Sequence, residues 1–163
     1  MDGELAPKIF DSPENVIEVN EYTSRLLMSE ILCSFFNVVH LGNSMIIYDL
    51  DYSSDDHESS DIMLALYIST CSCFMLAISL NIRYVIALKW RKAKHYVVGD
   101  ETILSSGIWK DMIAETMISM IGPHFFLQSL VYRETNTDLG IEVEYRINHI
   151  LCTVVWFKCY GIL

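Results

Sequence analysis

The residues that most often perform chemistry are scattered in this chain. The cysteines do not have the spacing of zinc sites, and no two histidines share a helical face at ligand spacing. The sequence has no glycine-rich phosphate loop, no His-Glu-x-x-His and no Gly-x-Ser-x-Gly motif. We therefore expect neither an enzyme nor a bound cofactor or metal. The residues concerned are His40, His57, His95, His124, His149, Cys33, Cys71, Cys73, Cys152 and Cys159.

An acidic segment supplies the first ligands of a calcium-binding loop but not the others. Asp49, Asp51 and Ser53 alternate as they do in an EF-hand. The sixth position is Ser54 instead of Gly, however, and the twelfth is Ser60 instead of Glu. We predict a solvated acidic loop here, with only weak attraction for external cations.

The composition indicates that these polar residues lie in an unusually apolar chain. The 163 residues are 52% hydrophobic and 20% charged, whereas about 25% charge is typical of a soluble domain. The length suits one domain of ordinary size. A net charge of −10 argues against a nucleic-acid partner.

Four stretches contain no Asp, Glu, Lys or Arg, and we predict an all-α, four-helix transmembrane bundle from them. A helix needs about 20 apolar residues to cross a bilayer core of about 30 Å. The alternative, a soluble helical bundle, would show a charged face with a period of about 3.6 residues, and the second stretch has none. The stretches are Ile31–Tyr48, Ile62–Ile82, Thr116–Tyr132 and Ile147–Phe157. The expected spans cover about 26–48, 62–88, 108–132 and 147–163, after an acidic cytoplasmic tail, 1–25, without the apolar segment of a signal peptide.

The distribution of Lys and Arg predicts how the bundle is oriented. A basic loop follows the second span, and the loop after the first span has no Lys or Arg. Because Lys and Arg favour the cytoplasmic side, we expect this loop and the N-terminus inside the cell. The expected location is the plasma membrane, as a multi-pass protein in contact with lipid. The basic loop contains Lys89, Arg91, Lys92 and Lys94.

Three charged residues fall inside the expected spans and form a predicted intramembrane charge network. A lone Lys at the bilayer centre costs roughly 2.5–3.5 kcal/mol, so Lys158 needs a partner. Antiparallel spans bring Glu115 and Lys158 to similar depth, and we expect them to pair, with Arg83 supporting from the cytoplasmic side. In the alternative interpretation, Lys158 is simply the inner end of a truncated helix.

Other polar residues recur at helical spacing along the first span. Glu30, Ser34, Asn37 and Ser44 define one stripe, and His40 lies close to it. We expect this stripe to pack against neighbouring helices and to serve interhelical hydrogen bonding.

Gly122 and Pro123 lie in the middle of the third expected span. Proline lacks a backbone donor and clashes with the preceding turn. We therefore expect a kink or break at this position, with neighbouring helices satisfying the freed carbonyls.

These residues resemble the S1–S4 region of small-conductance calcium-activated potassium channels. Residues 115–125, in which Glu115 precedes an apolar run that ends at Pro123, are similar to that family's S3; the family usually has His where this chain has Gly122. Residues 148–160 resemble its S4, with Lys158 at the position of the first basic residue. The resemblance extends over residues 26–163. Further matching residues are Trp109, Lys110, Phe125, Phe126, Leu127, Tyr132 and Glu134.

The resemblance implies a voltage-sensor-like domain at the periphery of a tetrameric potassium channel. Family members continue into a pore with a Gly-Tyr-Gly filter and a calmodulin-binding helix, and these 163 residues contain no such segments. Potassium transport and calmodulin binding are thus implied by the family alone, and we expect a channel truncated before its pore. The alternative is a small four-span interaction protein without channel activity.

Overall fold

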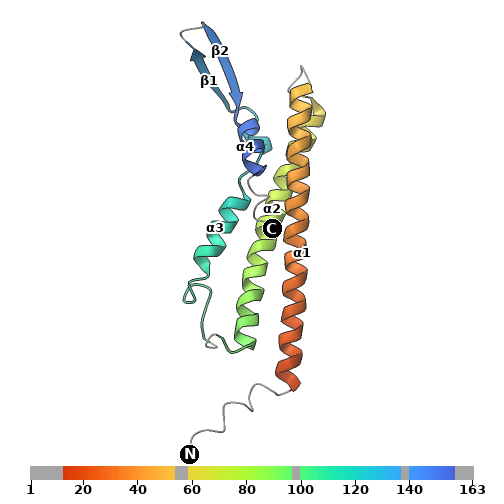
Figure 1. The fold of residues 1–163 in the computed structure, drawn as a ribbon, viewed down its shortest axis with the longest axis vertical. Coiled ribbons are helices and arrows are strands. Elements are labelled where there is room, and N and C mark those ends of the chain that lie inside the picture. Colours follow the sequence, from red (N-terminus) through yellow and green to blue (C-terminus); the bar gives the residue numbers. More distant parts are fainter. Residues whose placement is uncertain (1–12, 54–58, 97–99, 137–139, 157–163) are drawn as a thin grey trace, which may run out of the picture. The chain divides into compact units, whose positions relative to one another are not determined.

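The computed structural model describes residues 13–53, 59–96, 100–136 and 140–156, and most of them are helical (Figure 1). The α-helices in these ranges are α1 (Pro13–Ser53), α2 (Ser60–Ala93), α3 (Trp109–Ser119) and α4 (Ile147–Val155). A 3-10 helix, η1, spans Phe125–Leu127, and the strands β1 (Val131–Asn136) and β2 (Ile141–Arg146) form an antiparallel hairpin.

Two of the helices are long and apolar enough to cross a membrane, by length and composition. α1 has 41 residues and α2 has 34, which at about 1.5 Å per residue corresponds to roughly 60 and 50 Å. The predicted spans 26–48 and 62–88 lie inside them. α1 begins earlier than predicted, so much of the expected tail, 13–25, is helical. Proline is favoured at the first helical position, and Glu14 in the first turn complements the helix dipole.

The predicted third span, 108–132, does not form one kinked helix. α3 ends at Ser119, before Gly122 and Pro123, and the chain then continues through η1 into β1. The proline explains the break, because it removes a donor and disfavours helical geometry in the residue before it. With 11 residues, α3 is about 16 Å long, which is too short to cross a bilayer core by itself.

The hairpin was not predicted, although its sequence has the pattern of one. β-branched and aromatic residues alternate with charged ones along β2, and Gly140 has a positive φ of 62° between the two strands. Tyr132 pairs with Tyr145, and Arg133 with Glu144, whose Nε and Oε1 atoms are 2.7 Å apart. The predicted fourth span, 147–163, is described as far as residue 156, and α4 covers its first part.

The chain divides into two compact units. The first comprises Met1–Cys33 and Ile78–Thr116, and so contains the start of α1, the end of α2 and most of α3. The second comprises Ser34–Ala77 and Met117–Leu163, and so contains the rest of α1 and α2, η1, the hairpin and α4. All contacts discussed below lie within one unit.

The helices bury many polar side chains and expose many large apolar ones. Among the described residues, the buried polar or charged side chains are Ser29, His40, Asn43, Ser44, Asp51, Ser69, Thr70, Ser72, Ser79, Ser119, His124 and Asn148. The exposed apolar side chains of α1 include Leu27, Met28, Ile31, Leu32, Phe35, Val38 and Ile46, and those of α2 include Leu64, Ile68, Phe74, Met75, Ile78 and Ile82. Large apolar side chains thus face outwards along both helices, as they do not in a soluble amphipathic helix, while the buried faces mix polar residues with apolar ones such as Ile47 and Leu66.

Candidate functional site

A buried polar cluster in the second unit is centred on His40 of α1, which is 0% exposed. The imidazole Nδ1 lies 3.2 Å from the hydroxyl of Ser69 and 3.4 Å from that of Ser72, both on α2. Ser69 donates a 2.8 Å hydrogen bond to the carbonyl of Pro123. The thiol sulfur of Cys73 is 3.5 Å from each ring nitrogen. One histidine therefore connects α1, α2 and the segment that follows α3.

Gly122 is a glycine because the His40 ring occupies the space where a side chain would begin. A Cβ built on Gly122 would lie 2.4 Å from His40 Nε2 and 2.6 Å from Cε1, and 3.5 Å from the Cγ2 of Val155. The predicted break at Gly122 and Pro123 thus lies against the histidine of α1.

Side chains from other elements satisfy the backbone around this break. Asn148 of α4 donates to the carbonyl of His124 and accepts from its amide, each at 3.1 Å. The amide of Phe125 donates to the Thr70 hydroxyl at 3.2 Å. This is the arrangement that irregular backbone requires where water is scarce. Among the described residues, the Nδ1 atom of His124 is buried and makes no hydrogen bond.

The chemistry of the His40 cluster favours a role in packing. A thiol beside an imidazole is the pair that activates a cysteine nucleophile, but Cys73 is 0% exposed. In the part of the chain that the structure describes, no group of three or more His, Cys, Asp or Glu side chains could hold a metal ion. The cluster can therefore join helices through its hydrogen bonds.

A second polar cluster in the same unit corrects the interpretation of Asp51. This residue was expected in a solvated loop, but it lies in α1 with its side chain only 6% exposed. Its carboxylate contacts the Nε2 of His149, and its Oδ1 lies 3.8 Å from the Nη1 of Arg146. Tyr48 of α1 lies beside the His149 ring, with 5.9 Å between ring centroids. α1 is thus tied to the junction of β2 and α4.

The polar stripe predicted on α1 is confirmed in part. Ser44 and the nearby His40 are buried and Asn37 is half-buried, but Glu30 and Ser34 are exposed, and Ser29 and Cys33 are buried in their place. The buried face continues from residue 40 through 43, 47 and 51, at spacings of three and four, with residue 44 beside 43. Asn43, which the sequence analysis did not single out, donates to the carbonyl of Ala65 at 2.5 Å. The helical period alone could have found this face, because Asn43 is three residues after His40.

In the first unit, Arg83 of α2 and Glu115 of α3 form an ion pair with an N–O distance of 2.7 Å. Their side chains are 28% and 45% exposed. Asn81 donates to the hydroxyl of Thr116 at 3.4 Å beside them. Lys158, the third member of the predicted network, lies outside the described residues. Its pairing with Glu115 therefore stays a prediction.

Most of the predicted basic loop belongs to the last turns of α2. Lys89, Arg91 and Lys92 are helical, and Lys94 lies in the turn that follows Ala93. Cations in this position interact favourably with the C-terminal end of the helix dipole.

Comparisons of the chain with protein-family models, with curated proteins and with solved structures gave no match.

Proposed function

We propose that this chain is a membrane-embedded helical domain that packs at the periphery of an ion channel. The observation that carries the proposal is the exposure of Leu, Ile and Phe side chains along the outer faces of α1 and α2, together with buried polar residues such as His40, Asn43 and Ser69. Lipid is the solvent in which such helices are stable, since polar groups then prefer the protein interior. In this proposal, α1 and α2 are two of four spans in a voltage-sensor-like bundle.

The channel type follows from the resemblance to small-conductance calcium-activated potassium channels. In support, the acid at the start of the S3-like segment, Glu115, is paired with a base on α2, and Pro123 ends the same segment. The domain would support a pore formed by other segments, and a tetramer is the assembly that the family implies. Potassium and calmodulin would be bound by those other segments.

Membrane integration is the first test. The chain should remain in the pellet after alkaline carbonate extraction of membranes. Glycosylation acceptor sites introduced at Ser54 should be modified, and those at Lys92 should not, because the basic end of α2 is proposed to be cytoplasmic. A monodisperse polypeptide in detergent-free buffer would refute the proposal.

The channel assignment needs a functional test. In a chimera, this chain would precede the pore and calmodulin-binding segments of a small-conductance channel, and calcium-activated potassium current would be recorded in inside-out patches. We expect current with weak or no voltage dependence, because Lys158 alone would supply at most about 2.3 kcal/mol per 100 mV in each subunit. A chimera that reaches the cell surface and passes no current would refute the channel role.

A second candidate function is a small membrane interaction protein without channel activity. It is favoured by the way the polar groups are used, since Ser69 and Asn148 both hold the backbone around Pro123. Polar groups that serve only to hold helices together are also expected in a membrane protein without a pore. The same chimera distinguishes the two candidates, because surface expression without current is what this function predicts.

A further inference from the structure

We propose that the end of α2, together with the start of α1, binds the phosphate-bearing headgroup of an anionic lipid in the cytoplasmic leaflet. The inference rests on the proposed function in one respect, which is that α1 and α2 cross a bilayer. It concerns the first unit only. The site combines a pocket, a group of basic residues and two aromatic side chains.

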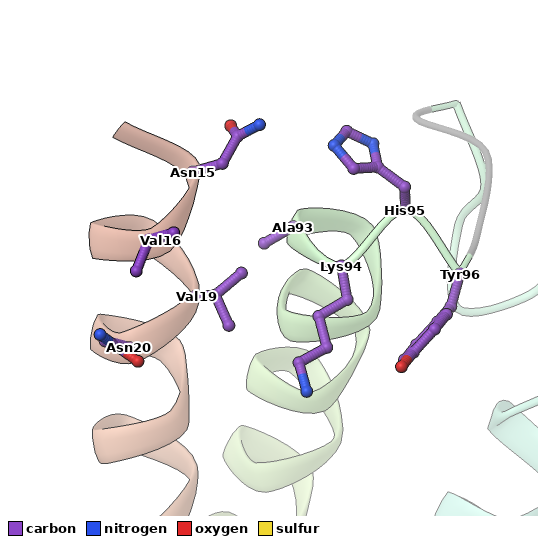
Figure 2. A pocket seen from close by; sticks show the side chains of 8 residues that line it. All are labelled: Asn15, Val16, Val19, Asn20, Ala93, Lys94, His95 and Tyr96. Atoms are coloured by element: carbon purple, nitrogen blue, oxygen red, sulfur yellow. The ribbon is translucent and has the colours of Figure 1, made fainter. Parts of the chain in front are cut away.

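The pocket lies between the two helix ends and has a volume of about 270 Å³ (Figure 2). Val16, Val19 and Ala93 give it an apolar floor, and Val19 and Ala93 face each other across the gap in Figure 2. Polar groups complete the lining. They are Asn15, Asn20, Lys94, His95 and Tyr96.

The turn after α2 fixes the residues on one side of this pocket. The amide of His95 donates to the carbonyl of Lys92 at 2.9 Å, and that of Tyr96 to the carbonyl of Arg91 at 3.0 Å. This is a Schellman motif, whose left-handed position is usually glycine. Here His95 occupies it with a φ of 56°, a backbone conformation that is unfavourable for residues other than glycine. The motif turns the chain so that residues 94–96 border the pocket.

The predicted second span ends at about residue 88, so Lys89 lies at its cytoplasmic end. Lys94 is six residues past that end, or about 9 Å along the helix, and headgroups extend roughly 5–8 Å beyond the hydrocarbon core. Lys94 runs back along α2 (Figure 2). Its ammonium lies over the Trp90 ring, 4.3 Å from the centroid. Lysine side chains commonly reach towards an interface in this way.

Aromatic contacts hold this part of the site in position. Trp90 donates from its indole nitrogen to the hydroxyl of Thr23 on α1 at 3.0 Å. The ring of Tyr96 packs edge-on against it, with centroids 6.2 Å apart. Trp and Tyr are the residues that prefer the headgroup region. The pocket edge thus carries both features of an interfacial site, basic groups and aromatic rings.

Charge complementarity identifies the occupant as an anionic headgroup. Four cations lie within Lys89–Lys94, at the end of a helix that the proposed function places in the membrane, and such clusters bind anionic lipids. On α1, Glu21 is paired with Arg25 at 2.5 Å. Glu14 and Glu18 are exposed and do not line the pocket. Among the described residues, the pocket lining therefore contains a cation and amide groups and no carboxylate.

The test uses the full chain reconstituted in phosphatidylcholine nanodiscs that contain a trace of dansyl-labelled lipid. With Trp109 and Trp156 replaced by Phe, energy transfer from Trp90 to dansyl reports the lipid at the site. We expect labelled phosphatidylserine and phosphatidylinositol phosphate to give much stronger transfer than labelled phosphatidylcholine. Equal transfer from all three lipids in intact nanodiscs would overturn this inference and leave the proposed function standing. A chain that does not enter nanodiscs would instead overturn the proposed function.

Variants separate the pocket from a diffuse attraction. Lys94→Gln should weaken binding about fivefold, the effect of one charge near a membrane surface, whereas the matched control Lys110→Gln should not change it. Ala93→Phe keeps every charge and fills the pocket, so it should also weaken binding. Unchanged binding in both Lys94→Gln and Ala93→Phe would refute the site. A soluble inositol phosphate that displaces the lipid at equal concentration would refute the lipid as its ligand.

Discussion

The backbone of Gly122 lies directly against the imidazole of His40 and leaves no space for a side chain. In Gly122→Ala, the new Cβ would lie 2.4 Å from Nε2 and 2.6 Å from Cε1 of the imidazole. The ring cannot retreat freely, because its Nδ1 is held near the hydroxyls of Ser69 and Ser72. Overpacking of this kind costs about 1–3 kcal/mol, and loss of one buried hydrogen bond adds about 1 kcal/mol.

The expected destabilisation is therefore about 2–4 kcal/mol. For a chain of this length, that lowers Tm by roughly 4–16 °C. Thermal unfolding of the detergent-solubilised protein, followed by intrinsic fluorescence, would measure it.

The chain provides its own control at Gly42, a helical glycine of α1 where a Cβ would have no atom within 4 Å. Gly42→Ala should be neutral or stabilising by up to about 1 kcal/mol. The double variant His40→Ala, Gly122→Ala should recover part of the loss, since the methyl group then has space. Equal Tm values for Gly122→Ala and Gly42→Ala would refute the reasoning.

Three further predictions concern the buried polar face and the ion pair. Asn43→Leu should lower the free energy of unfolding by about 0.6–1.7 kcal/mol, because an interhelical hydrogen bond is lost, and an unchanged Tm would contradict this. Asp51→Ala should lower the free energy of unfolding by about 1–3 kcal/mol, because it leaves its basic partners unsatisfied. Asp49→Ala, at an exposed position, should change it by less than about 0.5 kcal/mol. Similar losses in the two variants would show that burial of the Asp51 carboxylate does not matter. Single reversals Arg83→Glu or Glu115→Arg should reduce the yield of membrane-inserted protein, and the double reversal should restore it, as measured by carbonate extraction. Failure of the double reversal would mean that the 2.7 Å ion pair does not support insertion.

Much of the fold follows from local sequence patterns. The absence of charge over Ile62–Ile82 predicts a long apolar helix whatever its neighbours are, and α2 covers that stretch. The cyclic backbone of Pro123 disfavours a helix through residues 122 and 123 in any context, and α3 ends before them. The alternation of residues 141–146 also predicts a strand locally, although residues 133–146 were expected to form the loop between the third and fourth spans.

The depth and pairing of the polar residues were harder to predict. The stripe expected through Glu30 and Ser34 was displaced by one residue, because a polar residue in an apolar helix does not show which side its neighbours occupy. Asp51 had the sequence surroundings of a surface loop, and burial became possible only because Arg146 and His149 meet it from a distant segment.

Residue type and spacing along one segment are enough to locate the apolar stretches of this chain, the end of α3 before Pro123 and the basic end of α2. In contrast, the folded arrangement was needed to find that His40 takes the space beside Gly122, that Glu115 contacts Arg83 and that Lys94 borders a pocket. Local patterns do not reveal these contacts, because each of them joins segments far apart in the chain. Their distances are fixed by how helices pack, and packing depends on all the side chains in the contact together.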